Sequence, residues 1–224
     1  MVGIARKGKA GMSAAKQEIL ARIRAGLKQQ DGDRTQEYGS IVRTYDQGVG
    51  SDRERRLALF AERLEDYDAE VHRCGEENVA AVIAEALGRR GKRCLLTASN
   101  VPEAWRPAGF HFVQDRNLSY SEIDSSEGVL TMCAVAIAMT GTIVLRHSSE
   151  EGRRALTLIP DYHLCVVRES QVVETVAEGI RLMRGFHPFP ITTISGPSAT
   201  SDIEMTRIKG VHGPRILEVI LAAG

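Results

Sequence analysis

The sequence predicts one α/β domain built on a mostly parallel β-sheet, with a helical extension at its N-terminus. The first observation behind this prediction is an alternation, between residues 93 and 222, of short apolar segments with segments of helical periodicity. Continuous apolar strands separated by helices are typical of a parallel sheet that is covered on both faces. The second observation is size, because 224 residues with 43% hydrophobic and 26% charged content suffice for one large globular domain.

The N-terminal region divides into a basic stretch, a helix and a polar connection. The first stretch has no apolar period, which is typical of a disordered tail. Ser13 can cap a helix over residues 14–28, where apolar residues recur at helical spacing: Leu20, Ile23 and Leu27. The polar, glycine-rich segment that follows is too long for a tight connection. The expected division is a disordered tail over 1–12, a helix and linker over 13–50, and the α/β domain over 51–224.

Four more helices are predicted inside the α/β domain, and one of them starts in the segment 101–105. Ser51 and Glu54 have the spacing of a capping box, and apolar residues follow at helical spacing over 57–67. Asn78 can cap a second helix. A third helix is predicted over 170–183, where the apolar residues again share one face.

The remaining apolar segments are predicted to be strands, in chain order 69–73, 93–97, 110–113, 129–133, 141–145, 155–159, 163–167, 190–195 and 215–222. In open α/β sheets, ligands bind outside the carboxyl ends of the strands, where the connecting loops gather. That rule selects three loops as the candidate site, namely 139–142, 159–163 and 195–204.

The loop 195–204, with the sequence SGPSATSDIE, is the most informative of the three. Its glycine permits backbone geometry that is closed to other residues, and its hydroxyls lie close together. Such a loop before a helix N-terminus suits a carboxylate or phosphate, and the candidate binding residues are Ser195, Gly196, Ser198, Ala199 and Thr200. The alternative is purely structural, because Ser201 and Glu204 also have the spacing of a capping box. Spacing leaves both interpretations open.

Two further features are candidates for ligand binding. Thr140, Gly141 and Thr142 form a small hydroxyl-bearing turn, although such a turn can simply open a strand. Arg154 could hold an anion, because a planar guanidinium matches a carboxylate with two hydrogen bonds. The alternative for the segment 148–154 is an ordinary solvated loop.

The candidate catalytic residues are His163, His212, Asp202 and Glu204. Either histidine could act as a base, and either acid as an acid/base group or nucleophile. A histidine near a strand end is, however, more often a hydrogen-bonded structural residue. Nothing in the spacing decides between these roles.

Several classes of protein are disfavoured by the sequence. Lys+Arg and Asp+Glu are 29 each, so no basic surface for nucleic acid is indicated. The four cysteines are scattered without a C-x-x-C pair, and there is no H-E-x-x-H, so no metal or iron–sulfur site is expected on this chain. Nucleotide-binding glycine motifs and the G-x-S-x-G elbow are missing. No apolar run is long enough to span a membrane, and we expect a cytoplasmic protein with free thiols.

Four motifs resemble the LUD-domain family, from about residue 45 to the C-terminus. They are AIAMTGTIVL (136–145), GRRALTLIPDYH (152–163), TISGPSATSDIE (193–204) and GVHGP (210–214). The resemblance implies a three-layer α/β/α fold, of the type found in glucosamine-phosphate deaminases, ribose-phosphate isomerases and coenzyme A transferases. One departure is Met139, because an acidic residue commonly precedes Thr-Gly-Thr in the family.

The resemblance also implies a functional setting, a three-component bacterial system that oxidises L-lactate to pyruvate. Its other two components carry iron–sulfur or cysteine-rich motifs. This chain would then be the accessory or substrate-handling subunit without a cluster, with two partner subunits and a small anionic substrate such as L-lactate. The alternative is a free-standing enzyme, related to isomerases or coenzyme A transferases, that acts on a phosphorylated or acylated small metabolite. A third hypothesis is a scaffold that binds only its partners.

The N-terminal stretch gives a first testable prediction. A chain that starts at Met12 should melt within about a degree of the full chain, because removing an aperiodic basic stretch changes stability no more than an ordinary surface substitution. Thermal unfolding followed by circular dichroism checks this, and a large drop in melting temperature would contradict it.

Overall fold

The computed structural model describes residues 14–28, 38–42, 44–45, 48, 50–200, 208–209 and 212–224. The chain forms two compact units, residues 1–45 and residues 46–224. In the first unit, helix α1 (Ala14–Lys28) is the helix predicted there. The expected tail and the capping residue Ser13 lie outside the described residues. No described helix is both long and apolar enough to cross a membrane.

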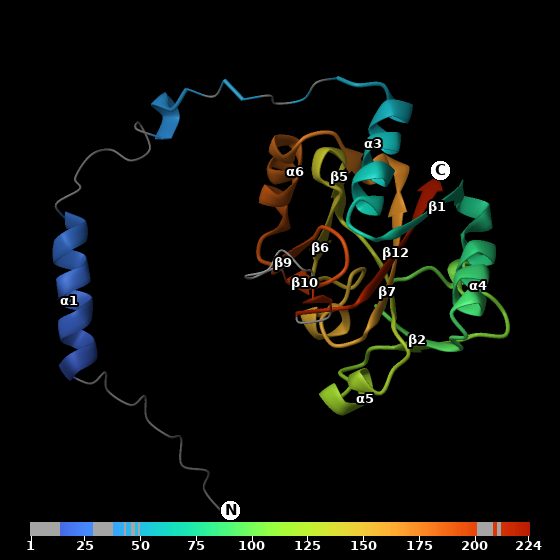
Figure 1. The fold of residues 1–224 in the computed structure, drawn as a ribbon. Coiled ribbons are helices and arrows are strands. Elements are labelled where there is room, and N and C mark those ends of the chain that lie inside the picture. Colours follow the sequence, from blue (N-terminus) through green and yellow to red (C-terminus); the bar gives the residue numbers. More distant parts are fainter. Residues whose placement is uncertain are drawn as a thin grey trace, which may run out of the picture. The chain divides into compact units, whose positions relative to one another are not determined.

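The second unit is built on a six-stranded sheet in which every neighbouring pair of strands is parallel (Figure 1). This confirms the predicted α/β fold with a mostly parallel sheet. The strands, in their order across the sheet, are β1 (Glu70–Gly75), β12 (Ile216–Ala223), β7 (Tyr162–Arg168), β4 (Val129–Met132), β2 (Cys94–Thr97) and β3 (His111–Gln114).

A second, four-stranded sheet lies against the first. Its order is β8 (Val172–Val173), β5 (Val135–Ile137), β6 (Thr142–Arg146) and β9 (Ile191–Ile194). Strand β6 runs antiparallel to both β5 and β9. The strands predicted at 141–145 and 190–195 therefore exist, but they pair with each other in this second sheet. A short antiparallel pair, β10 (Ala199–Thr200) and β11 (Ile208–Lys209), forms a separate two-stranded sheet.

Apolar side chains cover both faces of the parallel sheet. On one face, α4 (Val79–Arg89) packs Val79, Ile83 and Leu87 against the strands. On the other face, α3 (Arg53–Glu65) packs Leu57, Phe60 and Leu64 into a core shared with the second sheet. The short helix α5 (Tyr120–Asp124) covers the β2 and β4 side, and α6 (Val176–Met183) packs on the outside of the second sheet. Figure 1 shows α4 and α6 on opposite sides of the domain.

The N-termini of two predicted helices differ from the sequence analysis. The N-cap of α3 is Asp52, whose side chain accepts a hydrogen bond from the Arg55 backbone at 2.9 Å. The capping box predicted for Ser51 is therefore wrong, because the chain enters the helix one residue later. Asn78 makes no capping hydrogen bond, since a 3-10 turn over Glu76–Asn78 runs directly into α4.

Two other predicted elements are also corrected. The strand predicted at 155–159 is a 3-10 helix (Arg154–Thr157), in which Leu156 is buried and Thr157 binds back to Arg154. The helix predicted over 170–183 begins only at Val176, where Thr175 forms a capping box with Glu178. The residues before it make a 3-10 turn and strand β8. Apolar composition alone does not distinguish these short elements.

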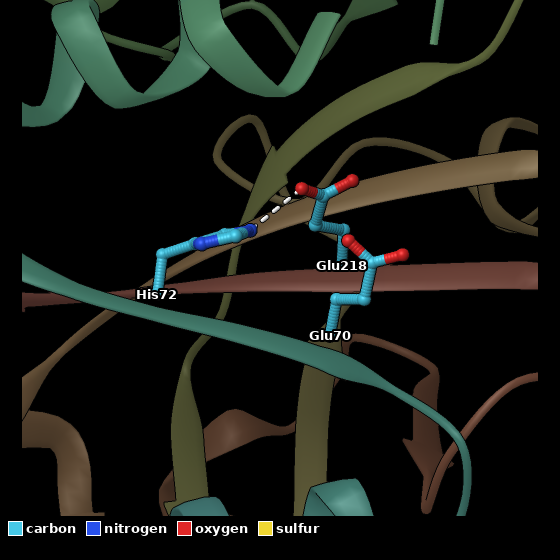
Figure 2. A group of neighbouring side chains, drawn as sticks. All are labelled: Glu70, His72 and Glu218. Carbon is cyan, nitrogen blue, oxygen red and sulfur yellow. Dashed lines mark hydrogen bonds and ion pairs between the residues drawn. The ribbon is translucent and has the colours of Figure 1, made fainter. Parts of the chain in front are cut away.

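A buried carboxylate links strand β12 to both neighbouring strands of the parallel sheet and to the end of α4. Glu218 on β12 is fully buried and binds side chains from three neighbouring elements. Figure 2 shows one of these partners, His72 of β1. Its oxygens lie 2.6 Å from His72 Nε2, 2.9 Å from the Arg89 guanidinium, 2.6 Å from Arg90 Nε and 2.9 Å from the Tyr162 hydroxyl. Burial alone would raise the pKa of Glu218, but the hydrogen bonds from His72, Arg90 and Tyr162 outweigh it and hold the pKa at about 2.

We expect Glu218→Gln to lower the free energy of unfolding by about 3 kcal/mol, because the substitution replaces a fully buried carboxylate, and its charge-assisted hydrogen bonds to His72 and Arg90, by a neutral amide. The wild-type stabilisation should be complete above pH 4.5 and decline as pH falls toward 2, since the folded-state pKa lies below the ordinary value. Urea unfolding across this pH range measures both effects.

The matched control is Glu70→Gln on the neighbouring strand. Glu70 also pairs with Arg90, but its side chain is 49% exposed. An exposed pair contributes only about 0.2–1 kcal/mol. If the two substitutions proved equally costly, the central role given to Glu218 would be wrong.

Candidate functional site

A cavity of about 210 Å³ lies between the end of β9 and the beginning of β7 and β12. Three separate segments of the chain build it. The lining residues are Arg154, Thr157, His163, Thr192, Thr193, Ile194, Ser195, Gly196, Pro197, Ser198, His212, Gly213, Pro214 and Leu217. The structure thus brings together the predicted site residues Arg154, His163, Ser195, Gly196, Ser198 and His212.

The cavity lies at the amino ends of the parallel strands, not at the carboxyl ends that the general rule predicts. His163 is the second residue of β7, and Leu217 is the second residue of β12. The difference arises because β9 belongs to the second sheet, and the carboxyl end of β9 lies beside the amino ends of β7 and β12. Ser195 follows β9 directly and brings its loop to this edge.

A chain of hydroxyl groups connects the Thr-Gly-Thr turn to this loop. The oxygens of Thr140 and Thr142 are 2.7 Å apart, and Thr142 lies 2.7 Å from the Ser195 hydroxyl. Gly141 has φ +57°, and a Cβ there would lie 2.8 Å from the Arg63 backbone. The two threonines do not line the cavity. Thr142 binds the Ser195 hydroxyl and Thr140 binds Thr142, while Gly141 allows close packing against α3.

The loop at Gly196 is clamped onto the segment before β12. The Ser198 backbone donates to the Pro214 carbonyl at 2.8 Å, and the His212 backbone donates to the Ser198 hydroxyl at 3.0 Å. Gly196 has φ +88°, and a Cβ there would lie 2.5 Å from Tyr67 Cβ. Only glycine fits this position without a shift of the neighbouring chain.

Arg154 brings a positive charge to the cavity. Its guanidinium donates to the Thr157 carbonyl at 2.9 Å and to the Thr157 hydroxyl at 3.2 Å. Within the described part of the chain, no carboxylate forms an ion pair with it. Partial burial lowers its pKa, since desolvation disfavours the cation. A partly desolvated cation without a counter-ion is suited to bind an anion.

His163 forms a buried wall of the cavity. It is 1% exposed, and its Nε2 lies 2.7 Å from the Thr131 hydroxyl. Its Nδ1 is buried and has no hydrogen-bond partner among the described residues. Burial, and to a lesser extent the charge of Arg154, lower the pKa of His163 to about 4. The imidazole is therefore neutral at physiological pH.

The other predicted site residues lie at the rim of the cavity, in strand β10 or outside the described residues. His212 is exposed at the rim of the cavity, where its backbone holds Ser198. Ala199 and Thr200 form strand β10, so the helix N-terminus predicted to follow Ser198 does not begin there. Asp202 and Glu204 lie outside the described residues, as does the predicted capping box at Ser201.

Three lining threonines, Thr157, Thr192 and Thr193, were missed by the sequence analysis. Thr157 orients Arg154, and Thr192 hydrogen-bonds His147 Nε2 at 2.7 Å. The spacing of Arg154 and Thr157, three residues apart, would have pointed to Thr157 had the segment been predicted as helical. No sequence signal separates Thr192 from an ordinary strand residue.

One cluster has the chemistry of a metal site. Glu70, His72 and Glu218 each bring a possible ligand atom within 4.8 Å of the others (Figure 2). However, the Glu218 carboxylate is already bound to the guanidinium groups of Arg89 and Arg90. Two fixed cations beside the ligand atoms oppose a metal ion, so this cluster is an ion-pair network.

Residues 57–222 match the sequence profile of the LUD domain. The chain belongs to the LUD-domain family. The match covers almost the whole second unit, including every segment that lines the cavity. The predicted family membership is therefore confirmed.

Named relatives agree with this membership. Lactate utilization protein C of Deinococcus radiodurans is 45% identical over 168 residues, which cover 74% of this chain and 78% of that protein. Uncharacterized protein YkgG of Escherichia coli is 33% identical over 103 residues, 42% of this chain and 43% of its own. A crystal structure of a DUF162 family protein from Deinococcus radiodurans aligns with a TM-score of 0.67 at 38% identity, covering 78% of this chain and 99% of that one.

The neutral state of His163 predicts a pH dependence of stability. Between pH 6.5 and 4 the unfolded chain binds a proton at this residue that the folded chain does not, since the folded pKa is about 4. Stability should therefore be fully present above pH 6.5 and fall by up to about 3 kcal/mol toward pH 4. Urea unfolding of the wild type and of His163→Gln at several pH values tests this. Identical pH slopes for the two proteins would contradict it.

Proposed function

We propose that this LUD-domain protein is the substrate-handling subunit of a bacterial system that oxidises L-lactate, and that iron–sulfur clusters reside on its two partner subunits. The names of several relatives, Lactate utilization protein C, support the lactate-related role. The alignment with the Deinococcus protein covers 74% of this chain and 78% of that protein, which makes a common role reasonable.

The observation that carries the proposal is the unpaired cation in a small polar cavity. Arg154 has no acidic partner among the described residues, and Ser195 and Ser198 line the same cavity. A cavity of about 210 Å³ is below the range of about 300–1,000 Å³ that is usual for drug-sized ligands. A small monocarboxylate such as lactate matches both the charge and the size.

The arrangement of the thiols supports placing the clusters on the partners. Cys133 and Cys165 are fully buried and belong to the same core, whereas Cys74 and Cys94 lie on separate strands of the sheet. Burial raises the pKa of Cys165 to about 12, which disfavours the thiolate that a metal requires. In the proposed system this chain holds and orients the substrate, and the electrons leave through a partner protein.

We expect Arg154→Met to abolish or strongly slow growth on L-lactate when it replaces the wild-type chain in a deletion strain. The change removes the charge that holds the carboxylate while keeping a long apolar stem. Growth rate on L-lactate against growth on glucose is the measurement, with the amount of folded protein checked in parallel.

Arg215→Met is the matched control, because Arg215 is an exposed arginine at the start of β12 whose partner Asp161 is also exposed. It should support normal growth. If Arg154→Met grew as well as the control, the cavity would not handle the substrate. Normal growth of the deletion strain itself would reject the lactate role altogether.

The alternative, an enzyme for phosphorylated or acylated metabolites, makes a different prediction for the purified chain. Sugar phosphates or acyl-coenzyme A would then raise its melting temperature more than L-lactate does. Co-purification with two partner proteins would favour the subunit role.

A further inference from the structure

We infer that a second cavity, at the carboxyl ends of β1, β12 and β7, binds the phosphate group of a small phosphate ester. The cavity has a volume of about 330 Å³ and lies at the opposite end of the strands from the cavity of Arg154. The side chains that line it are those of Arg53, Arg56, Glu76, Arg168, Glu169 and Ser170. This site is separate from the proposed lactate site and does not depend on it.

The position of this cavity in the fold is the first argument. Glu76 directly follows β1, Arg168 ends β7, and Gly224 directly follows β12. After β1 the chain turns to α4 on one face of the sheet, whereas after β7 it turns to β8, which belongs to the sheet on the other face. In open α/β sheets, ligands bind beyond the carboxyl ends of strands whose connections leave to opposite faces. The cavity occupies such a crevice.

Three guanidinium groups give the cavity its charge. Arg53 and Arg56 come from the first turn of α3, and Arg168 comes from the end of β7. Arg53 forms an ion pair with the buried Glu169, and Arg168 forms one with Glu76 at 2.9 Å. Among the lining side chains, three arginines therefore stand against two glutamates, and one positive charge is in excess.

The excess charge belongs to Arg56. Its side chain forms no ion pair or hydrogen bond with any group in the described part of the chain. Nε is buried without a partner, whereas the two terminal nitrogens, which have no described partner either, are not buried. A ligand in the cavity can therefore reach these two donors. Because the guanidinium is partly desolvated, water screens its attraction for an anion less than at an open surface.

The other two guanidinium groups are also accessible. The side chain of Arg53 is 60% exposed and that of Arg168 is 31% exposed. Arg168 is held in place, because its Nε and Nη2 both donate to Glu76 and its guanidinium lies 4.8 Å from the centroid of the Trp105 ring. Donors from two separate elements, α3 and β7, thus line one cavity.

This set of donors fits a phosphate group better than a carboxylate. A carboxylate has two oxygens and one charge, which a single guanidinium satisfies. A phosphate ester has three peripheral oxygens and about two charges, so it can bind several guanidinium groups at once. The volume also lies within the range of about 300–1,000 Å³ that is usual for small-molecule sites, which leaves room for the organic part of an ester.

The test is calorimetric titration of the full-length protein, at neutral pH and constant ionic strength, with glycerol 3-phosphate, inorganic phosphate and glycerol. Both phosphate compounds should bind, and glycerol should not. Acetate is compared with them in Arg154→Met, in which the first cavity lacks its cation. There acetate should bind at least tenfold more weakly than glycerol 3-phosphate.

Arg56→Met should weaken the binding of glycerol 3-phosphate about tenfold or more, because it removes a charged donor and keeps a long apolar stem. Arg55→Met is the matched control, since Arg55 is an exposed arginine of the same helical turn that does not line the cavity. It should bind as the wild type does. Arg154→Met should also retain the binding of glycerol 3-phosphate.

The fluorescence of Trp105 is a second measurement that needs no substitution. Trp105 is the single tryptophan of the chain and lies against the guanidinium of Arg168. Its emission should change saturably as glycerol 3-phosphate is added to the wild type. If Arg56→Met did not fold, this titration would decide, and an unchanged emission would overturn the inference.

No binding of glycerol 3-phosphate, binding of inorganic phosphate alone, equally tight binding of acetate, or unchanged affinity in Arg56→Met would each overturn the inference. So would a loss of binding in Arg154→Met, because the ester would then occupy the first cavity. These outcomes are separable from failure of the proposed function. Stabilisation by phosphate esters that persists in Arg154→Met comes from this second site and leaves the lactate role untouched.

Discussion

The buried carboxylate of Glu218 is the interaction on which the rest of the domain depends. It ties β12 to His72 on β1, to Arg89 and Arg90 at the end of α4, and to Tyr162 on β7. A charge in this position is stable only while all of these partners stay in place. The register of three neighbouring strands and the position of one covering helix are therefore fixed together.

The cavity depends on the same strand. Successive residues of a strand point to opposite faces, so Leu217 lines the cavity on one face while Glu218 is held on the other. Tyr162 and His163 repeat this arrangement on β7, one residue bound to the carboxylate and the next at the cavity wall. The ion-pair network thus positions the amino ends of β7 and β12, against which the loop after β9 closes.

Sequence reasoning recovered the strands of the parallel sheet but not their division between two sheets. Apolar runs such as 141–145 and 163–167 look alike, because periodicity reports burial and not the partner of a strand. The segment 155–159 looks equally strand-like, and its 3-10 form depends on tertiary contacts of Leu156. Candidate residues from three distant segments, namely Arg154 and His163, the loop after β9, and His212, do meet in one cavity, whereas the predicted turn at 140–142 does not line it. What the sequence could not provide was the edge of the sheet at which the cavity lies, the lack of an acidic partner for Arg154 among the described residues, or the partner of His163. Each of these depends on packing between segments far apart in the chain.

The pairing of β1 with β12 also constrains the order in which the domain can form. His72 and Glu218 are 146 residues apart in the chain, yet they belong to adjacent strands. Because β12 lies between β1 and β7, the sheet has a gap until the last strand arrives. During synthesis, the chain must therefore emerge from the ribosome as far as β12 before the six-stranded sheet can close, and such long-range parallel pairing is slow. A chain released short of residue 216 would leave β1 and β7 with unpaired edges, the kind of surface on which other chains aggregate.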